Sequence, residues 1–471
     1  MEKGLSDHQS PEQSSMPPTT TSLAYGLADE HISGDPSRKH LVSSGKPPLY
    51  LREESPSAPT TQRTSSPQMD QSDRIELTQL PALQRGDGRW AASLLIECAA
   101  AVVQKDAARV QHFMWMLNEL ASPYGDFDQR LASCFLQGLF CRITGTGSRQ
   151  HRVLCSAAER QCLFDPMRKM MLKFQEMSPW TTFGHVAANG ALMEAVEGEF
   201  RVHILDVSST MCTQWPTLLE ALATRSDGAP HLRLTSILVS SEEAVVKVMT
   251  EVGARLRKFA RLMGVPFEFR LLQQPELELL DVATIQPRAG EALIVNCIHS
   301  LHNVSERPPP SSSSSAASPR DLVLNTFRSL NPKLVIIADD EADLISRGDF
   351  MSRFVEAVRY YSLFFESVEE SFPRTSNERL MLERIVSRKI VNLLACDEAS
   401  ISERQEKSSQ WVMRMRRAGF ALAKFSDDVA DDARALLKRY KEGWGYTNTD
   451  VGLFLTWKEQ PTVFATSWKP F

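Results

Sequence analysis

The spacing of apolar residues changes after Gly198, and this change constrains the fold most. Up to that glycine, apolar residues recur at helical spacing from Trp90 onward; beyond it they form short runs separated by segments of helical spacing. The runs are 202–207, 232–239, 267–272, 292–298 and 334–339, and helices are expected near 214–225, 241–263 and 320–330. Strands that alternate with helices form parallel sheets covered on both faces. We therefore predict an α/β fold: a Rossmann-like, methyltransferase-like core sheet flanked by helices.

An N-terminal helical cap is predicted to precede this sheet, over about 89–180. Three helices are expected between 90 and 145, the last ending at Gly145 and Gly147, and two more near 157–177 and 181–197. A later helical segment is predicted at about 350–395, where apolar residues again recur at helical spacing. The α/β core is assigned to about 198–345 and 405–471.

The last part of the chain is expected to add antiparallel strands to the core. A helix near 405–418 precedes a strand at 420–425, and Asp427 is expected to cap a further helix. The runs 451–457 and 463–468 predict a final strand pair hinged at Pro461. Three tryptophans in this region are expected to pack within the structure: Trp444, Trp457 and Trp468.

Two segments have a low-complexity composition. Residues 1–86 are rich in Ser, Pro, Thr and Gln and show almost no apolar periodicity, so this arm is predicted to be disordered. A Pro/Ser run at 306–320 interrupts the predicted core and is expected to be a surface loop insert.

Composition narrows the possible partners. The formal net charge is -5 and the pI about 6.1, which gives no electrostatic footprint for an autonomous nucleic-acid binder. No apolar stretch approaches the ~20 residues that cross a bilayer. The eight cysteines include no CxxC pair, and four of them near His151 are expected to be core thiols rather than metal ligands. DNA contact is therefore expected only through partners, with no membrane contact and no metal.

In a doubly wound sheet, ligands bind at the carboxyl ends of the strands. The turn after the first strand, 206–212, contains no glycine, although a nucleotide or S-adenosylmethionine pocket normally needs one there for close backbone approach. We predict no cofactor. A small-molecule methyltransferase remains the alternative, because Asp206 at a strand end is compatible with it.

Other polar residues at predicted strand ends form no catalytic constellation. His203 lies within a strand and is expected to be a core histidine, whereas His299 and His302 could face the crevice. The acidic cluster at 339–343 resembles a metal site, but we expect its carboxylates to cap the next segment and stay solvated. The sequence thus predicts a protein that is not an enzyme.

Three ordered motifs resemble those of the plant GRAS family. The first is similar to the VHIID motif and comprises Val202, His203, Ile204, Leu205 and Asp206, then Gln214, Trp215 and Pro216. The second resembles the PFYRE region and includes Phe354, Tyr360, Tyr361, Arg384, Arg388 and Ile390. The third, with Trp444, Trp457 and Trp468, resembles the SAW region. The resemblance covers roughly 89–471 and implies a GRAS domain at 87–471.

Three stretches are similar to the SHORT-ROOT branch of the family in particular: 115–125, 178–185 and 370–380. The chain also departs from the family pattern. Lys389 stands where the family has a glutamate after the arginine, and the closing Ser-Ala-Trp reads Thr466, Ser467, Trp468. An ion pair that depends on a carboxylate at 389 is therefore not expected here.

The resemblance implies a nuclear transcriptional co-regulator. Such proteins heterodimerise with a SCARECROW-type GRAS protein and dock on C2H2 zinc-finger factors of the indeterminate-domain type, which contact DNA. Proteins of this branch control tissue patterning and asymmetric cell division, occur in nucleus and cytoplasm, and can move between cells.

The residues of the first helices agree with a binding role. Large aromatic and Met side chains are enriched in the desolvated centres of interfaces, and the helices between 90 and 145 hold more of them than one bundle face needs. The candidates for partner binding are Trp115, Met116, Tyr124, Phe135 and Phe140. The alternative for each ring is that it packs inward within the cap.

Overall fold

The computed structural model describes residues 89–160, 162–306, 317–345, 349–396 and 403–471. All of them belong to one compact unit, residues 80–471. The predicted arm at 1–86 and most of the 306–320 insert lie outside the described residues, so both remain predictions. Within the described ranges, no helix combines the length and apolar character needed to cross a membrane.

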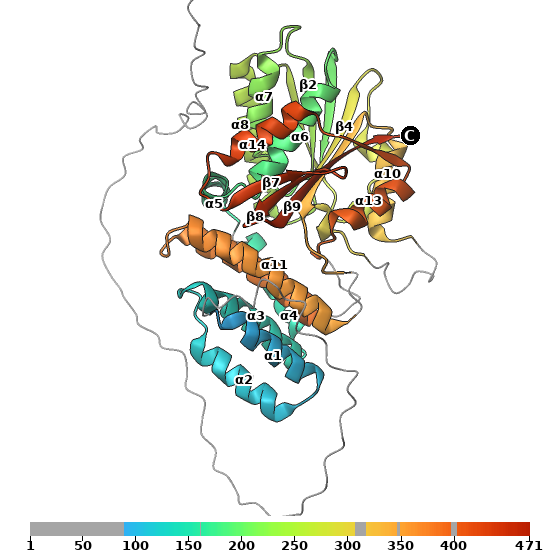
Figure 1. Ribbon diagram of the computed structural model, residues 1–471. Helices are drawn as coiled ribbons and strands as arrows, with labels where there is room; N and C mark the ends of the chain where they lie inside the picture. The colour runs from blue at the N-terminus through green and yellow to red at the C-terminus, as the bar shows by residue number, and fades with distance from the viewer. Residues whose placement is uncertain (1–88, 161, 307–316, 346–348, 397–402) are drawn as a thin grey trace, which may run out of the picture. The chain divides into compact units, whose positions relative to one another are not determined.

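Five parallel strands form the centre of the sheet, in the order β3-β2-β1-β4-β5 (Figure 1). They are β1 (Arg201–Asp206), β2 (His231–Leu238), β3 (Phe267–Gln273), β4 (Ala292–Ile298) and β5 (Leu334–Asp340). This order reverses between β1 and β4, as in the doubly wound Rossmann arrangement. The predicted fold class is confirmed.

Four antiparallel strands extend the sheet beyond β5. The long strand β9 (Gln460–Pro470) pairs with β5 on one side and with β6 (Phe420–Ala423) and β8 (Leu453–Trp457) on the other. The edge strand β7 (Trp444–Asn448) pairs with β8 and was not predicted. It lacks an apolar alternation because none of its residues is fully buried.

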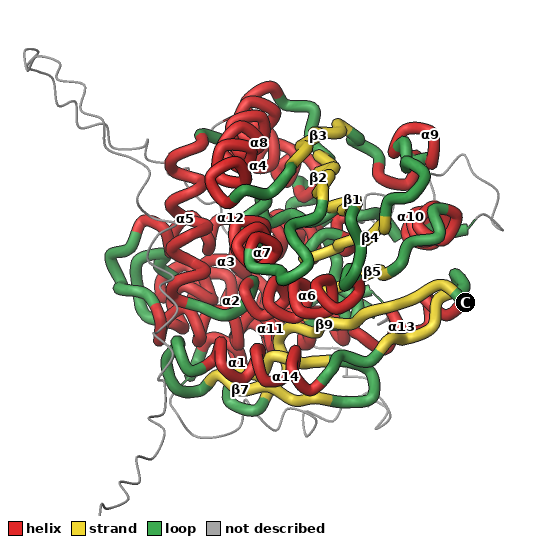
Figure 2. Tube along the Cα trace, turned by 90° about the horizontal axis from the view of Figure 1, so that it is seen from above, coloured by secondary structure: helices red, strands yellow, loops and turns green. Residues whose placement is uncertain are grey.

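Helices cover both faces of the sheet (Figure 2). One face packs against α6 (Thr182–Ala195), α7 (Trp215–Ala223), α8 (Glu243–Met263) and α14 (Asp427–Leu437). The other packs against α9 (Val282–Ile285), α10 (Pro319–Ser329) and α13 (Ser408–Arg417). Successive strand residues face opposite ways, so Ile204 belongs to the first core and Leu205 to the second. This two-sided burial explains the continuous apolar runs in the sequence.

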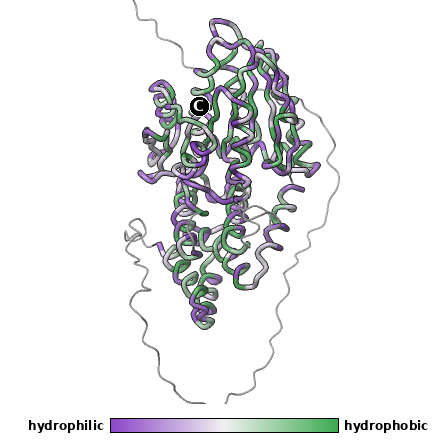
Figure 3. Tube along the Cα trace, turned by 90° about the vertical axis from the view of Figure 1, so that its right-hand side faces the viewer, coloured by the Kyte–Doolittle hydropathy of each residue, from purple (hydrophilic) through white to green (hydrophobic). Residues whose placement is uncertain are grey.

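Seven helices form the cap, from two distant parts of the chain. They are α1 (Ala91–Val103), α2 (Ala107–Leu120), α3 (Phe127–Ile143), α4 (Gly147–Arg160), α5 (Phe164–Met177), α11 (Phe350–Ser371) and α12 (Asn377–Ala395). Asp106 and Asp126 cap α2 and α3, the latter in a capping box with Gln129. Figure 3 shows apolar residues along both the cap helices and the strands. The cap and the first sheet face share one continuous apolar core.

Some helix limits differ from the predicted ones. The single helix expected near 157–177 is two helices, because α4 ends at Arg160 and α5 begins at Phe164. Pro166 explains the break: proline fits the first turn of a helix but not its interior. The cap of α14 is Ser426, whose side chain accepts a hydrogen bond from the Val429 amide, rather than the predicted Asp427.

Two glycines allow close helix packing. A β carbon on Gly138 of α3 would lie 2.9 Å from Leu394 of α12, and one on Gly184 of α6 would lie 3.0 Å from the β carbon of Ala338 on β5. The Leu394 methyl group could rotate away from a β carbon at 138, but the β carbon of Ala338 cannot, so the depth of α6 depends on the missing side chain at Gly184.

The cap is also tied to the sheet by polar contacts. Glu366 of α11 accepts hydrogen bonds from Trp457 Nε1 at 3.2 Å and from Lys458 Nζ at 2.8 Å, beside the turn between β8 and β9. The same carboxylate pairs with Arg89 at 2.7 Å. One side chain of α11 therefore holds the C-terminal hairpin and the start of the described chain together.

Candidate functional site

Asp206 ends β1 at the point where the strand order reverses. Its Oδ2 accepts a hydrogen bond from Trp215 Nε1 at 2.8 Å, and its Oδ1 accepts from Asn296 Nδ2 at 3.2 Å and from the Ser208 amide at 3.1 Å. The residue is buried, and burial raises the pKa of its carboxyl group although these donors oppose the shift. The carboxylate is thus used to join β1, β4 and α7.

The amides around Asp206 are bonded to one another as well. Asn296 Nδ2 also donates to Gln214 Oε1 and to Ser208 Oγ, both at 2.9 Å, and Gln214 Nε2 donates to Asn189 Oδ1 at 2.9 Å. Pro216 lies in the first turn of α7, where proline is favoured. These motif residues fill the reversal point with protein hydrogen bonds.

The glycine-free turn after β1 adopts a left-handed backbone nevertheless. Met211 and Cys212 have φ angles of 51° and 60°, a region that normally favours glycine. Both residues thus take a backbone conformation that is costly for a residue with a β carbon. The Cys212 side chain is buried in the core of the first sheet face, and Met211 packs against that core.

His203 is buried in the middle of β1, as are Val202, Ile204 and Leu205. Its Nε2 donates to Thr235 Oγ1 at 2.9 Å while its Nδ1 accepts from Arg233 Nη2 at 2.9 Å. Burial, with the nearby guanidinium, lowers its pKa to about 4. A neutral imidazole with both nitrogens hydrogen-bonded to β2 thus helps to hold the two strands together.

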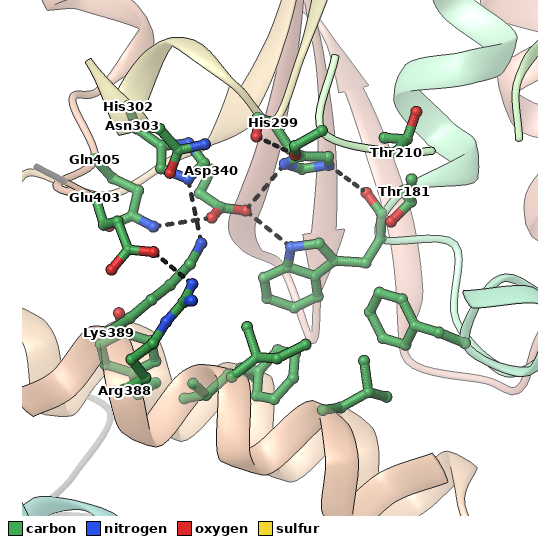
Figure 4. Close-up of a pocket in the computed structure, with 18 of the residues that line it drawn as sticks. Thr181, Thr210, His299, His302, Asn303, Asp340, Arg388, Lys389, Glu403 and Gln405 are labelled. Atoms are coloured by element: carbon green, nitrogen blue, oxygen red, sulfur yellow. Dashed lines mark hydrogen bonds and ion pairs between the residues drawn. The ribbon is translucent and has the colours of Figure 1, made fainter. Parts of the chain in front are cut away.

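A cavity of about 300 Å³ lies at the carboxyl ends of β4 and β5, beneath α5, α11 and α12 (Figure 4). Its core side presents His299, His302 and Asp340, and its cap side presents Arg388 and Lys389 of α12. Both histidines, which were predicted as able to face the crevice, line this cavity. The cavity lies at the carboxyl ends of strands, the edge of the sheet at which such folds bind ligands, but beside the reversal point rather than at it.

The acidic cluster beside the cavity is buried, so the prediction that it stays solvated was wrong. Asp339, Asp340 and Glu341 are each less than a tenth exposed. The segment before α13 covers them: Gln405 Nε2 donates to Asp340 Oδ2 at 3.2 Å, and the Ser408 amide donates to Glu341 Oε2 at 2.9 Å. This segment has no apolar periodicity that would place it there from sequence.

His302 links Asp339 to the cap. Its Nδ1 donates to Asp339 Oδ1 at 2.7 Å, and its Nε2 accepts a hydrogen bond from Lys389 Nζ at 3.2 Å. Burial opposes ionisation of Asp339, but the interactions with His302 and His299 outweigh it and hold the pKa of that carboxyl far below its usual range. Position 389, where the family pattern has a glutamate, thus carries a lysine here, and its ammonium contacts the His302 imidazole.

His299 follows β4 with φ of 51°, a costly conformation for a residue with a β carbon. Its Nε2 donates to the Trp180 carbonyl at 3.4 Å, and its Nδ1 lies 3.8 Å from Asp339 Oδ1 and 3.6 Å from Asp340 Oδ1. Burial disfavours the imidazolium, but the two carboxylates prevail and raise the pKa of His299.

Of the groups among the described residues, only His299, Asp339 and Asp340 meet the geometric criteria for holding a metal ion. Their oxygens already have other partners, however. Asp340 Oδ1 accepts from Trp180 Nε1 at 2.9 Å, Asp340 Oδ2 accepts from Gln405, and both Asp339 oxygens lie within 3.0 Å of His302 Nδ1. The arrangement favours a buried ion-pair cluster over a metal centre.

A second ion-pair group closes the cavity on the cap side. Glu403 accepts from Arg388 Nη2 at 2.5 Å and lies 3.0 Å from His151 Nε2. Burial raises the pKa of Glu403, but His151, Arg388 and Lys389 lower it to about 2. Of the cysteines considered with His151, only Cys155 contacts it, with Sγ 3.5 Å from Nε2. Nothing in the sequence had indicated a role for Glu403.

The predicted partner-binding residues lie in two environments. Trp115, Tyr124 and Phe140 are 61%, 69% and 56% exposed, and Met116 is half-buried. Phe135 is a correction, because it is fully buried and its ring packs edge-on against Phe354 at 5.5 Å between centroids. Phe135 therefore belongs to the cap core and not to a partner surface.

The C-terminal tryptophans lie within the extended sheet. Trp457 and Trp468 are fully buried, and half-buried Trp444 packs on Trp457 with 4.8 Å between ring centroids. Trp468 lies opposite Val335 of β5 and Leu422 of β6. These positions fit packing between strands better than docking of a partner.

Comparison with known proteins gives one family and several similar chains. The sequence model of the GRAS domain family matches residues 91–469. Protein SHORT-ROOT of Arabidopsis thaliana is 49% identical over 82% of this chain and 74% of its own length. Protein SHORT-ROOT 1 of Oryza sativa subsp. japonica is 48% identical over 81% and 69%.

A solved structure is also similar. The crystal structure of SCL7 in Oryza sativa superposes with a TM-score of 0.67 at 26% identity, covering 80% of this chain and 99% of that one.

Proposed function

The chain belongs to the GRAS domain family and is a SHORT-ROOT-like regulator of transcription in plant development, and we propose that it acts by pairing with a SCARECROW-type GRAS protein through its helical cap. The match confirms the resemblance that the three motifs carry. The similar relatives are GRAS regulators, and such regulators are generally nuclear.

The observation that supports pairing through the cap is the exposure of large rings on α2, on α3 and on the loop between these helices. Of the five exposed aromatic side chains among the described residues, three lie between 115 and 140: Trp115, Tyr124 and Phe140. Leaving such rings in water forgoes about 1.5–3 kcal/mol of burial for each. A partner that covers them would recover part of this, and rings of this kind dominate interface energetics.

The test is a double charge substitution, Trp115→Glu with Phe140→Glu. We expect its affinity for a SCARECROW-type GRAS protein, measured by calorimetry, to fall at least about tenfold, because two carboxylates would be buried unpaired. The matched control is Phe200→Glu, at a ring that is even more exposed and lies next to β1 on the core. Unchanged affinity of a folded double variant would exclude this surface.

We also propose that DNA is reached through a C2H2 zinc-finger factor of the indeterminate-domain type. The support is the net charge of -5, since affinity for nucleic acid comes mainly from neutralising phosphates. In a gel-shift assay, the purified protein alone should leave DNA unshifted and should retard it further when the zinc-finger factor is present. A shift by the protein alone, with a steep dependence on salt, would contradict this.

The proposed setting is the nucleus and cytoplasm, with movement between cells, in control of tissue patterning and asymmetric division. A fluorescent fusion expressed in a single cell layer tests it, and retention in that layer would argue against movement. The methyltransferase alternative is disfavoured because the Asp206 carboxylate already accepts three protein hydrogen bonds. Calorimetric titration with S-adenosylmethionine should give no heat of binding.

A further inference from the structure

We propose that the cavity between the strand ends and the cap binds a small amphipathic organic acid, with its carboxylate beside Lys389 and its hydrocarbon part against the aromatic wall. The site is separate from the exposed rings of the cap. It does not depend on the proposed pairing with another protein.

The ammonium of Lys389 is the group that would bind the carboxylate of the ligand. Its ammonium has three N–H donors, and the one hydrogen bond it makes to a described residue is to His302 Nε2. No carboxylate of a described residue lies within ion-pair distance of it, whereas Arg388 is paired with Glu403. An ammonium that lines a cavity with spare donors is a binding group for an oxyanion.

The charges around this end leave room for an anion. Arg388 and Lys389 are cationic, and His151, with a pKa of about 9, is protonated at neutral pH. They face the carboxylates of Glu403, Asp339 and Asp340, with His299 between the last two. When His299 is protonated, four positive groups face three negative ones, and a monoanionic ligand would make the site neutral.

The opposite wall of the cavity is apolar and adaptable. It is formed by Met170, Phe174, Trp180, Phe364 and Leu382, together with the rings of Tyr360 and Tyr361. Ligand sites combine such walls with a few convergent polar groups, and Met side chains adjust to irregular shapes. At about 30 Å³ per water, 300 Å³ corresponds to roughly ten water molecules, enough for a ligand of about a dozen non-hydrogen atoms.

A buried acceptor without a partner supports a ligand here. Gln405 lines the cavity and is only 1% exposed, and its Nε2 is fixed on Asp340 Oδ2. Its Oε1 accepts no hydrogen bond from any described residue. Such a group costs free energy unless a donor reaches it from the cavity. The strained backbone of His299 at the same site is also typical of binding positions.

The test uses the full-length protein with ¹³C-labelled Met methyl groups and two matched probes, 3-(4-hydroxyphenyl)propionate and 3-(4-hydroxyphenyl)propan-1-ol. We expect the acid to shift the methyl signals of Met170 and Met171 and to leave that of Met413 on α13 unchanged, since Met413 is exposed outside the cavity. The acid should bind about tenfold more tightly than the alcohol, because a charged hydrogen bond is lost in the latter.

Variants separate the contribution of the Lys389 charge to binding from that of the space in the cavity. Lys389→Met should bring the acid and the alcohol to equal affinity, Lys389→Arg should retain the preference, and Lys247→Met on the exposed face of α8 should behave as the unmodified chain. Leu382→Trp should weaken both probes by filling the space. Thermal unfolding curves identify any variant that fails to fold.

Equal binding of acid and alcohol to the unmodified protein would overturn the role of Lys389. Absence of shifts at Met170 and Met171 at millimolar acid would overturn the site. Because none of these readouts involves a protein partner, they stand or fall separately from the pairing experiment.

Discussion

The crevice at the strand ends and the outer face of the cap differ in how their side chains are used. At the crevice, Asp206 and its neighbours are bonded to one another, so a position where this type of sheet binds ligands is occupied by structure. On the cap, Trp115 and Tyr124 lie largely in water, without an internal role. The contrast teaches that the residues of a sequence motif can stabilise the fold while the exposed aromatic surface lies elsewhere.

The largest effect should come from breaking the crevice. Asp206→Ala leaves Trp215 Nε1 and the Ser208 amide without the acceptor that they have at the end of β1. We expect a loss of about 3–5 kcal/mol in the free energy of unfolding, measured with urea. Asp450→Ala, at an exposed carboxylate, serves as the control and should cause no measurable change. A loss below about 1 kcal/mol would mean that the motif is not structural.

Two aromatic rings on α3 sharpen the comparison within the cap. Phe135→Ala empties a site between α3 and α11 and should cost about 3–5 kcal/mol. Phe140→Ala, on the same helix but mostly exposed, should change stability by less than about 0.5 kcal/mol. Similar losses for both variants in chemical denaturation would show that Phe140 is covered, against the proposed interface.

The free energy of unfolding should depend on pH because of the pair between His151 of the cap and Glu403 in the segment before α13. Burial disfavours charge on His151, but Cys155 and Glu403 raise its pKa to about 9 from an ordinary value near 6.5. The folded state therefore binds the proton more tightly than the unfolded state, so the protonated His151 adds to the free energy of unfolding. This contribution is fully present below pH 6.5 and is lost as the pH rises through 9. Its size is on the order of 1–3 kcal/mol.

The variant His151→Gln should remove that contribution, so that its unfolding free energy depends less on pH between 6.5 and 9 than that of the unmodified chain. Urea titrations at several pH values measure this. If the two proteins lose stability in parallel over this range, the pair with Glu403 is not responsible.

The smallest expected effect concerns the contact between α11 and the C-terminal hairpin. Glu366→Gln keeps an acceptor for Trp457 but removes the charge that pairs with Arg89 and Lys458. Because both cations are partly exposed, we expect a loss of about 0.5–1 kcal/mol, which shrinks at high salt. Thermal unfolding at low and high salt tests it, and a loss that is independent of salt would point to packing instead.

The sequence predicted the parallel sheet and most helices because their apolar periods are strong. It missed β7, whose residues are at most half-buried, and the division near Pro166, where two helices have similar texture. At the site, the positions of His299 and His302 followed from the strand ends. The burial of Asp339 and the approach of Gln405 could not be predicted, because both depend on segments distant in sequence.

Gly184 has a consequence for the cavity that lies some distance from it. Because α6 rests on Ala338 at a depth that a methyl group would forbid, the chain just before this helix reaches the strand ends, where the Trp180 indole bonds Asp340. Replacement by alanine would lift the helix from the sheet by a few tenths of an ångström and carry the indole with it. A substitution that adds a single carbon inside a helix would therefore reshape the cavity wall without touching any residue that lines it.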